Sequence, residues 1–141
     1  MFELTHEVEF SAAHRLHSPH LTEEQNRALY GPCHRLHGHN YVLEVAVRGP
    51  ADPTTGMVMD LNVLSRVIQA RIFDAVDHRN LEADVPWLEG TITTAENVAA
   101  AFWDRLTEAL AGELPPGGRL HRLRLYESRA NFVDYYGPDA T

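Results

Sequence analysis

Apolar and polar residues alternate along the first part of the chain. Acidic residues and a threonine occupy the odd-numbered positions between 3 and 9, and apolar residues occupy most even-numbered ones: Phe2, Leu4, Val8, Phe10 and Ala12. Successive side chains of a strand point to opposite faces of a sheet, so this pattern predicts a half-buried strand over 2–14. A second alternating run predicts a strand from about Leu36 to Arg48.

Two later segments change to a helical period. Asp60 is the expected N-cap of a helix with apolar residues three or four positions apart, namely Leu61, Leu64, Ile68, Ile72 and Val76. Another helix is predicted to open at Thr93–Glu96, where a capping box would let Glu96 reach back to the N-cap amide, and to end near Gly112. A short helical turn is expected near Thr22–Leu29.

Two closing strands are predicted at about 119–128 and 131–136, with a short polar turn between them. The element order is then ββααββ. It favours the α+β class, with a four-stranded antiparallel sheet and two helices on one face, in a single domain over 1–141. Such a sheet has two open edges, which favour pairing with another subunit, so we expect a homo-oligomer.

Composition narrows the function classes. The net charge of −8 argues against a nucleic-acid partner, and no apolar run approaches the ~20 residues needed to cross a bilayer. The amino-terminal residues do not resemble a secretory signal. A single cysteine fits a reducing, cytoplasmic setting.

The histidines supply the candidate chemistry. His37 and His39 project from the same side of the second predicted strand, with Cβ atoms roughly 6.5–7 Å apart, so both can bind one zinc ion. His14 is the best third ligand, because it ends the first strand on its apolar parity; His17 is a competitor. We expect the remaining candidates to be ordinary surface or hydrogen-bonded histidines: His6, His20, His34 and His121.

Cys33 precedes His37 by four residues and allows two interpretations. It could be a fourth zinc ligand, which would make a closed structural site and a non-catalytic, zinc-stabilised binding module. It could instead stand off the metal as a general base, with its thiolate favoured by the nearby positive charge. A hydrolase that activates water would not need this cysteine. Spacing alone does not choose among these alternatives.

Six motifs, in order, resemble one family: Phe10–Leu16, the Cys-x3-His-Gly-His-Asn run at 33–40, Gly56–Leu61, Asp77–Leu81, Thr93–Val98 and Leu125–Ser128. Together they are similar to the 6-pyruvoyl-tetrahydropterin synthase family, including its 6-carboxy-tetrahydropterin synthase branch. The resemblance implies a tunnelling fold whose sheets join into an oligomeric barrel, commonly a hexamer, with active sites at subunit junctions. It also implies 7,8-dihydroneopterin triphosphate as the substrate.

The resemblance further implies a role for each matching residue. Zinc would be bound by His14, His37 and His39, with a position left open for substrate. The catalytic residues would be Cys33, Asp77 and His78. The pterin would be bound by Glu127, which anchors the ring, and by the segment containing Thr93, Thr94 and Glu96. Candidates for binding the triphosphate are Arg15, Arg35 and Arg79, chosen for their proximity to the motifs.

The spacing of three residues between Cys33 and His37 resembles the 6-carboxy branch, which acts in queuosine (7-deazaguanine) biosynthesis. We therefore expect 6-carboxy-tetrahydropterin as the product, released with acetaldehyde and triphosphate. The 6-pyruvoyl product is the alternative, because Gly56–Leu61, 77–86 and the long stretch between His14 and Cys33 resemble the other branch.

Overall fold

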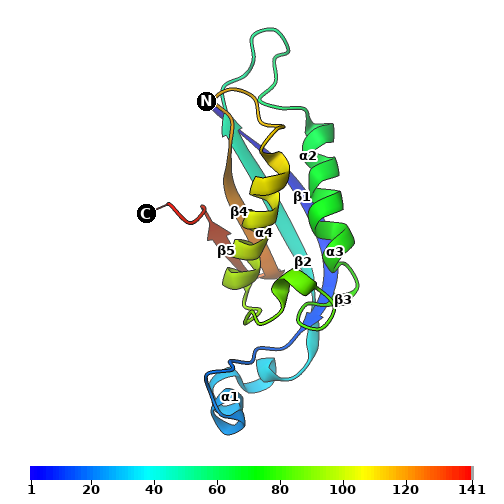
Figure 1. The fold of residues 1–141 in the computed structure, drawn as a ribbon, viewed down its shortest axis with the longest axis vertical. Helices are drawn as coiled ribbons and strands as arrows, with labels where there is room; N and C mark the ends of the chain where they lie inside the picture. The colour runs from blue at the N-terminus through cyan, green and yellow to red at the C-terminus, as the bar shows by residue number, and fades with distance from the viewer. Residues whose placement is uncertain (141) are drawn as a thin grey trace.

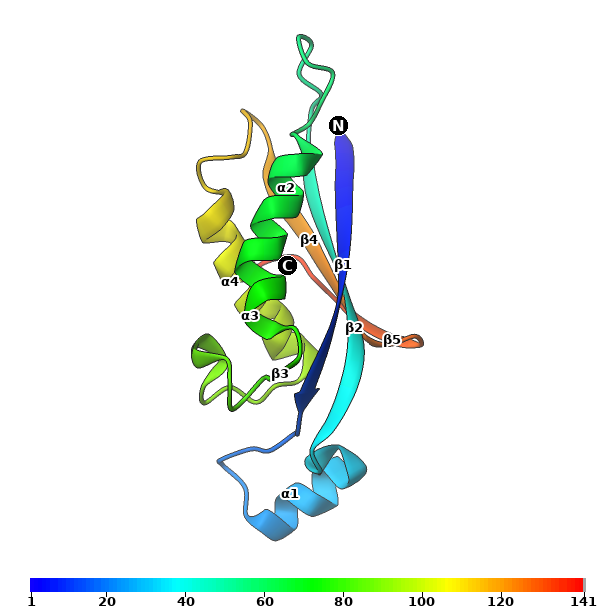
Figure 2. The same cartoon turned by 90° about the vertical axis from the view of Figure 1, so that its right-hand side faces the viewer.

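The structure is a computed structural model that describes residues 1–140. Its sheet has the strand order β3-β1-β2-β4-β5. The four long members pair antiparallel and are β1 (Phe2–His14), β2 (His37–Gly49), β4 (Arg119–Ser128) and β5 (Asn131–Tyr135). The helical segments over 61–76 and 95–110 cover one face of this sheet, as expected for the α+β class (Figures 1 and 2).

The prediction of four strands is wrong by one short strand. Residues Arg79–Asn80 form β3, which pairs parallel with β1 through Ala12 and Ala13. Two residues are too few to show an alternating pattern. The pairing is parallel because the preceding helix ends beside β1 and the chain then runs in the same direction as β1. The pairing brings the segment after that helix beside the end of β1.

Helix α2 (Leu61–Ile68) begins at its predicted N-cap, Asp60, whose side chain accepts a hydrogen bond from the Asn62 amide (2.8 Å). It continues through one wide π turn, η2 (Gln69–Phe73), into α3 (Asp74–Val76). The continuous helical segment therefore ends directly before Asp77, and it brings that residue to the edge of β1.

Helix α4 (Ala95–Leu110) begins one residue later than the predicted cap. Thr94 is the N-cap, and its hydroxyl accepts a hydrogen bond from the Asn97 amide (3.3 Å). The capping box predicted from Thr93 and Glu96 does not form, and Glu96 is exposed in the first turn. Two successive threonines offer the same capping chemistry, so tertiary contacts at Thr93 decide between them.

The core lies between the sheet and the helices. On the sheet side, Phe10 stacks on Tyr41 with ring centroids 5.0 Å apart, and Phe102 of α4 packs edge-on against Phe10 at 5.9 Å. Leu43 and Leu106 are fully buried in the same layer. These residues occupy the strand and helix faces that their periodicity predicts, so the hydrophobic effect holds α4 against the β1–β2 hairpin.

The connection between β1 and β2 forms a separate lobe beyond the end of the sheet (Figure 1). It contains α1 (Glu23–Tyr30) and the short helical turn η1 (Gly31–His34). Helix α1 agrees with the turn expected near Thr22–Leu29 and is capped by Thr22 and Gln25. A further short turn, η3 (Pro86–Leu88), precedes α4. Within residues 1–140, no helix combines the length and apolar character needed for a membrane span.

Candidate metal centre

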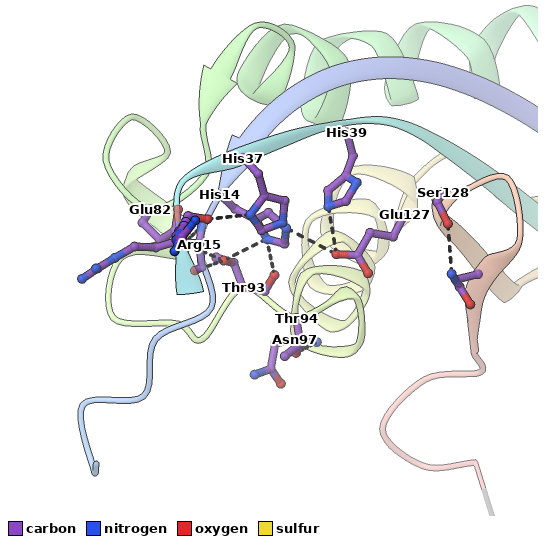
Figure 3. Close-up of polar contacts among 12 residues, drawn as sticks. His14, Arg15, His37, His39, Glu82, Thr93, Thr94, Asn97, Glu127 and Ser128 are labelled. Carbon is purple, nitrogen blue, oxygen red and sulfur yellow. Dashed lines mark hydrogen bonds and ion pairs between the residues drawn. The ribbon is translucent and has the colours of Figure 1, made fainter. Parts of the chain in front are cut away.

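Three histidines and one carboxylate meet where the β1–β2 hairpin leaves the helix layer. The antiparallel register places His14 directly opposite His37 and places His39 opposite Ala12. The donor atoms of His14, His37, His39 and Glu127 all lie within 4.8 Å of one another. In Figure 3, all four side chains converge above the amino-terminal end of α4. Two histidines were candidates for the third metal ligand. His14 belongs to this group in the structure, and His17 lies outside it.

Backbone carbonyls orient two of the imidazoles. The Nδ1–H of His14 donates to the Thr93 carbonyl (2.8 Å), and the Nδ1–H of His37 donates to the Arg35 carbonyl (2.6 Å). In a neutral imidazole the other nitrogen then carries a lone pair, and here Nε2 faces the group. A histidine held in this way presents a preset metal-binding nitrogen.

Glu127 completes the group from a β-bulge in β4. The β4–β5 register shifts between Tyr126 and Ser128, and Glu127 lies at that irregularity. Its Oε1 is 3.3 Å from Nε2 of His14 and 3.3 Å from Nε2 of His39. Both of these nitrogens are buried without a hydrogen-bond partner. Lone pairs that face a carboxylate need a positive charge between them, supplied by a proton or a metal ion.

These residues fit a divalent cation by chemistry and by spacing. Imidazole nitrogen and carboxylate oxygen are common zinc ligands. Bonds of about 2.0–2.1 Å in a tetrahedron separate neighbouring ligands by about 3.3 Å, which matches the separations from Glu127. The carboxylate of Glu127, and not the thiol of Cys33, lies beside the three histidines, so a closed site with Cys33 as fourth ligand is not the arrangement found.

The charges of the group are strongly coupled. Burial lowers the pKa of His14, but the adjacent Glu127 carboxylate and the hydrogen bond with the Thr93 carbonyl outweigh it and leave that pKa raised. Burial lowers the pKa of His39, with smaller effects from the neighbouring imidazoles and an opposing one from Glu127. The adjacent His14 imidazole is the main cause that lowers the pKa of Glu127. The carboxylate is therefore held ionised against the histidines.

Two residues that the sequence did not single out support the group. Glu82 accepts a hydrogen bond from the Thr93 hydroxyl (2.8 Å) and another from the Arg15 amide (2.8 Å). Tyr41 packs against His39 with ring centroids 5.4 Å apart, and its buried hydroxyl has no hydrogen-bond partner in the described chain. Burial raises the pKa of Tyr41. Tyr41 lies on the same predicted strand face as His37 and His39, so alternation could have placed it at the site. No pattern in the sequence could have placed Glu82 there.

Cys33 lies apart from the four-residue group. It belongs to η1, its side chain is exposed, and its carbonyl accepts a hydrogen bond from the Leu16 amide (2.8 Å). The three arginines considered for the triphosphate are likewise exposed: Arg15, Arg35 and Arg79.

Asp77 and His78 form a second polar unit at the edge of β1. Asp77 accepts hydrogen bonds from the Ser11 amide (3.0 Å) and from Nδ1 of His78 (2.7 Å). The Ser11 amide is the main cause that lowers the pKa of Asp77, followed by burial, which opposes it, and by His78. His78 has a positive φ of 58° and a side chain that is 81% exposed. The pair is not part of the four-residue group, although His78 lines a shallow cavity together with Gly38 and His39.

The five-stranded sheet with helices on one face, and the partly buried histidine–carboxylate group at one end of its central hairpin, define an α+β protein with a candidate metal centre. The sequence agrees with this class: residues 3–138 match the family model described as 6-pyruvoyl tetrahydropterin synthase. The chain belongs to this family. It is accordingly a lyase-type enzyme rather than the non-catalytic module considered above.

Individual relatives cover nearly the whole chain. The 6-pyruvoyl tetrahydrobiopterin synthase of Poecilia reticulata is 43% identical over 136 residues, which are 95% of this chain and 89% of the relative. The 6-pyruvoyl tetrahydropterin synthase structure from Caenorhabditis elegans superimposes with a TM-score of 0.88 at 38% identity and covers 96% of this chain and 95% of that one. A 6-carboxy-5,6,7,8-tetrahydropterin synthase from Rickettsia conorii is 35% identical over only 78 residues, 55% of this chain and 49% of the relative. Similarity therefore favours the 6-pyruvoyl branch over the 6-carboxy branch that the cysteine spacing suggested.

Proposed function

We propose that this enzyme converts 7,8-dihydroneopterin triphosphate to 6-pyruvoyl-tetrahydropterin by eliminating triphosphate. The observation that carries the proposal is the His14–His37–His39 group, with two imidazoles held through Nδ1 and Nε2 turned inward, in a chain 43% identical to a named 6-pyruvoyl synthase. The reaction needs no external oxidant, because hydrogen moves from the side-chain carbons to the ring as the triphosphate leaves.

Zinc is the proposed metal, bound by His14, His37 and His39. When bound, it supplies Lewis acidity to the substrate's side-chain oxygens, which acidifies the neighbouring C–H and O–H bonds. The chain contributes the fixed tautomers: the carbonyls of Thr93 and Arg35 hold the Nδ1 protons, so no reorganisation is needed before binding.

Proton transfers are assigned to residues outside the metal group. The Cys33 thiolate removes a proton from the substrate side chain; its exposure allows a substrate to reach it. His78 transfers a proton on the other face of the substrate. Because its Nδ1 donates to Asp77, its Nε2 is the free position, and the exposed ring can enter a neighbouring site.

Substrate recognition is assigned to Glu127 and the start of α4. The Glu127 carboxylate has two oxygens that can accept hydrogen bonds from the guanidine-like edge of a pterin, a bidentate match. Its low pKa keeps it ionised for this role. The segment from Thr93 through Thr94 to Glu96 is proposed to line the same pocket, where the amides of the helix start can bind the pterin carbonyl.

Assembly is part of the proposal. In one protomer, Asp77 and His78 lie outside the group that includes His14 and Glu127, so we propose that they serve a site completed by a second copy. Sheet edges at β3 and β5 offer the pairing surfaces for a homo-oligomer, proposed to be a hexamer. The role of Cys33 as a free thiol supports a reducing, cytoplasmic location.

The 6-carboxy reaction is the second candidate, favoured by the three-residue spacing between Cys33 and His37. The zinc-loaded protein is incubated with 7,8-dihydroneopterin triphosphate, the pterin product is identified by mass spectrometry, and acetaldehyde is assayed enzymatically. We expect 6-pyruvoyl-tetrahydropterin and triphosphate without acetaldehyde. Acetaldehyde equal to the triphosphate released would establish the second candidate instead, and no triphosphate release would refute both.

A further inference from the structure

A second group of metal-ligating side chains lies in the lobe between β1 and β2. The donor atoms of His17, Glu23 and His34 lie within 4.8 Å of one another. His17 belongs to the segment that leaves β1, Glu23 to the first turn of α1, and His34 to the end of η1. From the sequence, His17 is only a competitor of His14 for the first centre and His34 is expected to be an ordinary histidine; the proposed function uses none of the three residues.

His34 has the same bonding arrangement as His14. Its Nδ1–H donates to the Leu16 carbonyl (3.0 Å), and its Nε2 lies 2.9 Å from Oε1 of Glu23. With the Nδ1 proton used in this way, a neutral His34 presents a lone pair to a carboxylate oxygen. His34 is only 7% exposed, and the two acceptor atoms lie too close together to face each other without a cation or a proton. A positive charge is needed between them.

His17 provides a third potential metal ligand. Its ring stacks on His34 with centroids 5.5 Å apart, and its buried Nδ1 has no hydrogen-bond partner among the described residues. A proton on His34 would neutralise Glu23 but would leave this nitrogen unpaired. A metal ion bound through this nitrogen would engage all three residues, since two imidazoles and a carboxylate form a common ligand set for zinc.

We propose that His17, Glu23 and His34 form a second binding site for a divalent transition-metal ion of the zinc class, distinct from the His14 centre. The half-exposed Glu23 can adjust its carboxylate to the ion. Arg27, whose Nη2 lies 3.6 Å from the same Glu23 oxygen, competes with the ion but is itself mostly exposed and free to turn away.

The site has a structural consequence for Cys33. The bound ion would join the segment after β1, helix α1 and turn η1 at one point, and His34 is the residue next to Cys33. The hydrogen bond from the Leu16 amide to the Cys33 carbonyl links the same two segments. A metal ion here would therefore hold the cysteine-bearing turn against the end of β1.

Metal binding tests the proposal directly. The metal-free protein is titrated with Co²⁺ and with Zn²⁺, and bound metal is measured by visible absorption and by mass spectrometry of the metal after gel filtration. In the wild type we expect two ions per chain, with separable affinities. In a His39→Ala background, which removes a ligand of the first centre, one site of unchanged affinity should remain. This background separates the present proposal from the proposed catalytic role.

Matched variants identify the ligands. Glu23→Gln and His17→Asn should each weaken the second site at least about 10-fold, while Glu24→Gln and His20→Ala, exposed neighbours outside the group, should leave it unchanged. Glu23 is 52% exposed, so its conservative replacement keeps the fold, and circular dichroism verifies this. If the wild type binds one ion per chain and Glu23→Gln changes nothing, His34 and Glu23 form only a protonated ion pair and the proposal is wrong.

Discussion

The imidazole Nδ1 of His14 lies 2.8 Å from the carbonyl oxygen of Thr93, although the two residues are 79 positions apart in the chain. Thr93 directly precedes the N-cap of α4, so the hydrogen bond joins the end of β1 to the start of the helix layer. Both residues are buried. The orientation of the candidate metal ligand therefore depends on how α4 packs on the sheet.

Replacing one ligand should remove the metal while preserving the fold. His39→Ala takes away an imidazole that is 22% exposed, so the core is little disturbed. We expect the affinity of the first centre for Zn²⁺ to fall at least about 100-fold, measured by competition with a chelating dye. His6→Ala, in a residue of β1 outside the group, is the control. Wild-type affinity in His39→Ala would contradict this assignment of the ligands.

Replacing Cys33 should separate catalysis from metal binding. Cys33→Ala removes the proposed base but no member of the four-residue group. Zinc content should stay at the wild-type level while turnover of 7,8-dihydroneopterin triphosphate falls about 10²–10⁴-fold. Metal analysis and a triphosphate-release assay measure the two effects on the same preparation. Loss of zinc in Cys33→Ala would restore the fourth-ligand interpretation.

Glu127→Gln should distinguish ring anchoring from metal ligation. An amide of the same shape cannot accept two charge-assisted hydrogen bonds, so we expect kcat/KM to fall roughly 10- to 100-fold at saturating zinc. The zinc stoichiometry should not change, because three histidines remain. If zinc affinity falls while KM for the metal-loaded enzyme is unaltered, Glu127 acts as the fourth ligand instead.

Asp77 should contribute stability that depends on pH. Its pKa is lowered in the folded state, first by the Ser11 amide, so the ionised form stabilises the fold above the unfolded pKa of about 3.9. That contribution is lost as the pH falls through the lower folded value. The difference in urea midpoint between the wild type and Asp77→Asn should therefore shrink between about pH 5 and pH 3. Asp104→Asn, in an exposed position on α4, should show no such trend.

The helix layer should carry much of the stability. Leu106 is fully buried between α4 and the sheet, so Leu106→Ala should lower the free energy of unfolding by about 2–5 kcal/mol, measured by urea denaturation. Leu29→Ala is the matched control, because Leu29 is 65% exposed on α1; its effect should stay within about 0.5 kcal/mol. Equal effects of the two changes would contradict the assigned core.

The strands and helices were largely predictable because their signals are local. Alternation gave β1 over the range found, and it gave β2 within a residue at each end. Among the helix caps, only the predicted N-cap of α4 was wrong. Thr93 and Thr94 have the same capping chemistry, and the contacts of Thr93 with His14 and Glu82 decide between them. Strand β3 escaped prediction because it is two residues long.

The candidate site was predictable to the extent that neighbours in sequence are neighbours in space. His37 and His39 share a strand, so their spacing alone placed both imidazoles on one face. The choice between His14 and His17 needed the hairpin register, in which His14 lies opposite His37. The contact of Glu127 with two imidazoles depends on the pairing of β4 beside β2, which no local pattern indicated.

The amino-acid sequence by itself determined the class of fold, the placement of His37 and His39 on one strand face, and the family resemblance. Periodicity and motif spacing depend only on residues that are close together in the chain. Only the tertiary structure decided that Thr93 and Glu82 support the first centre and that His17, Glu23 and His34 meet in the lobe. These contacts join segments that are separated along the chain, so packing and pairing between elements select them.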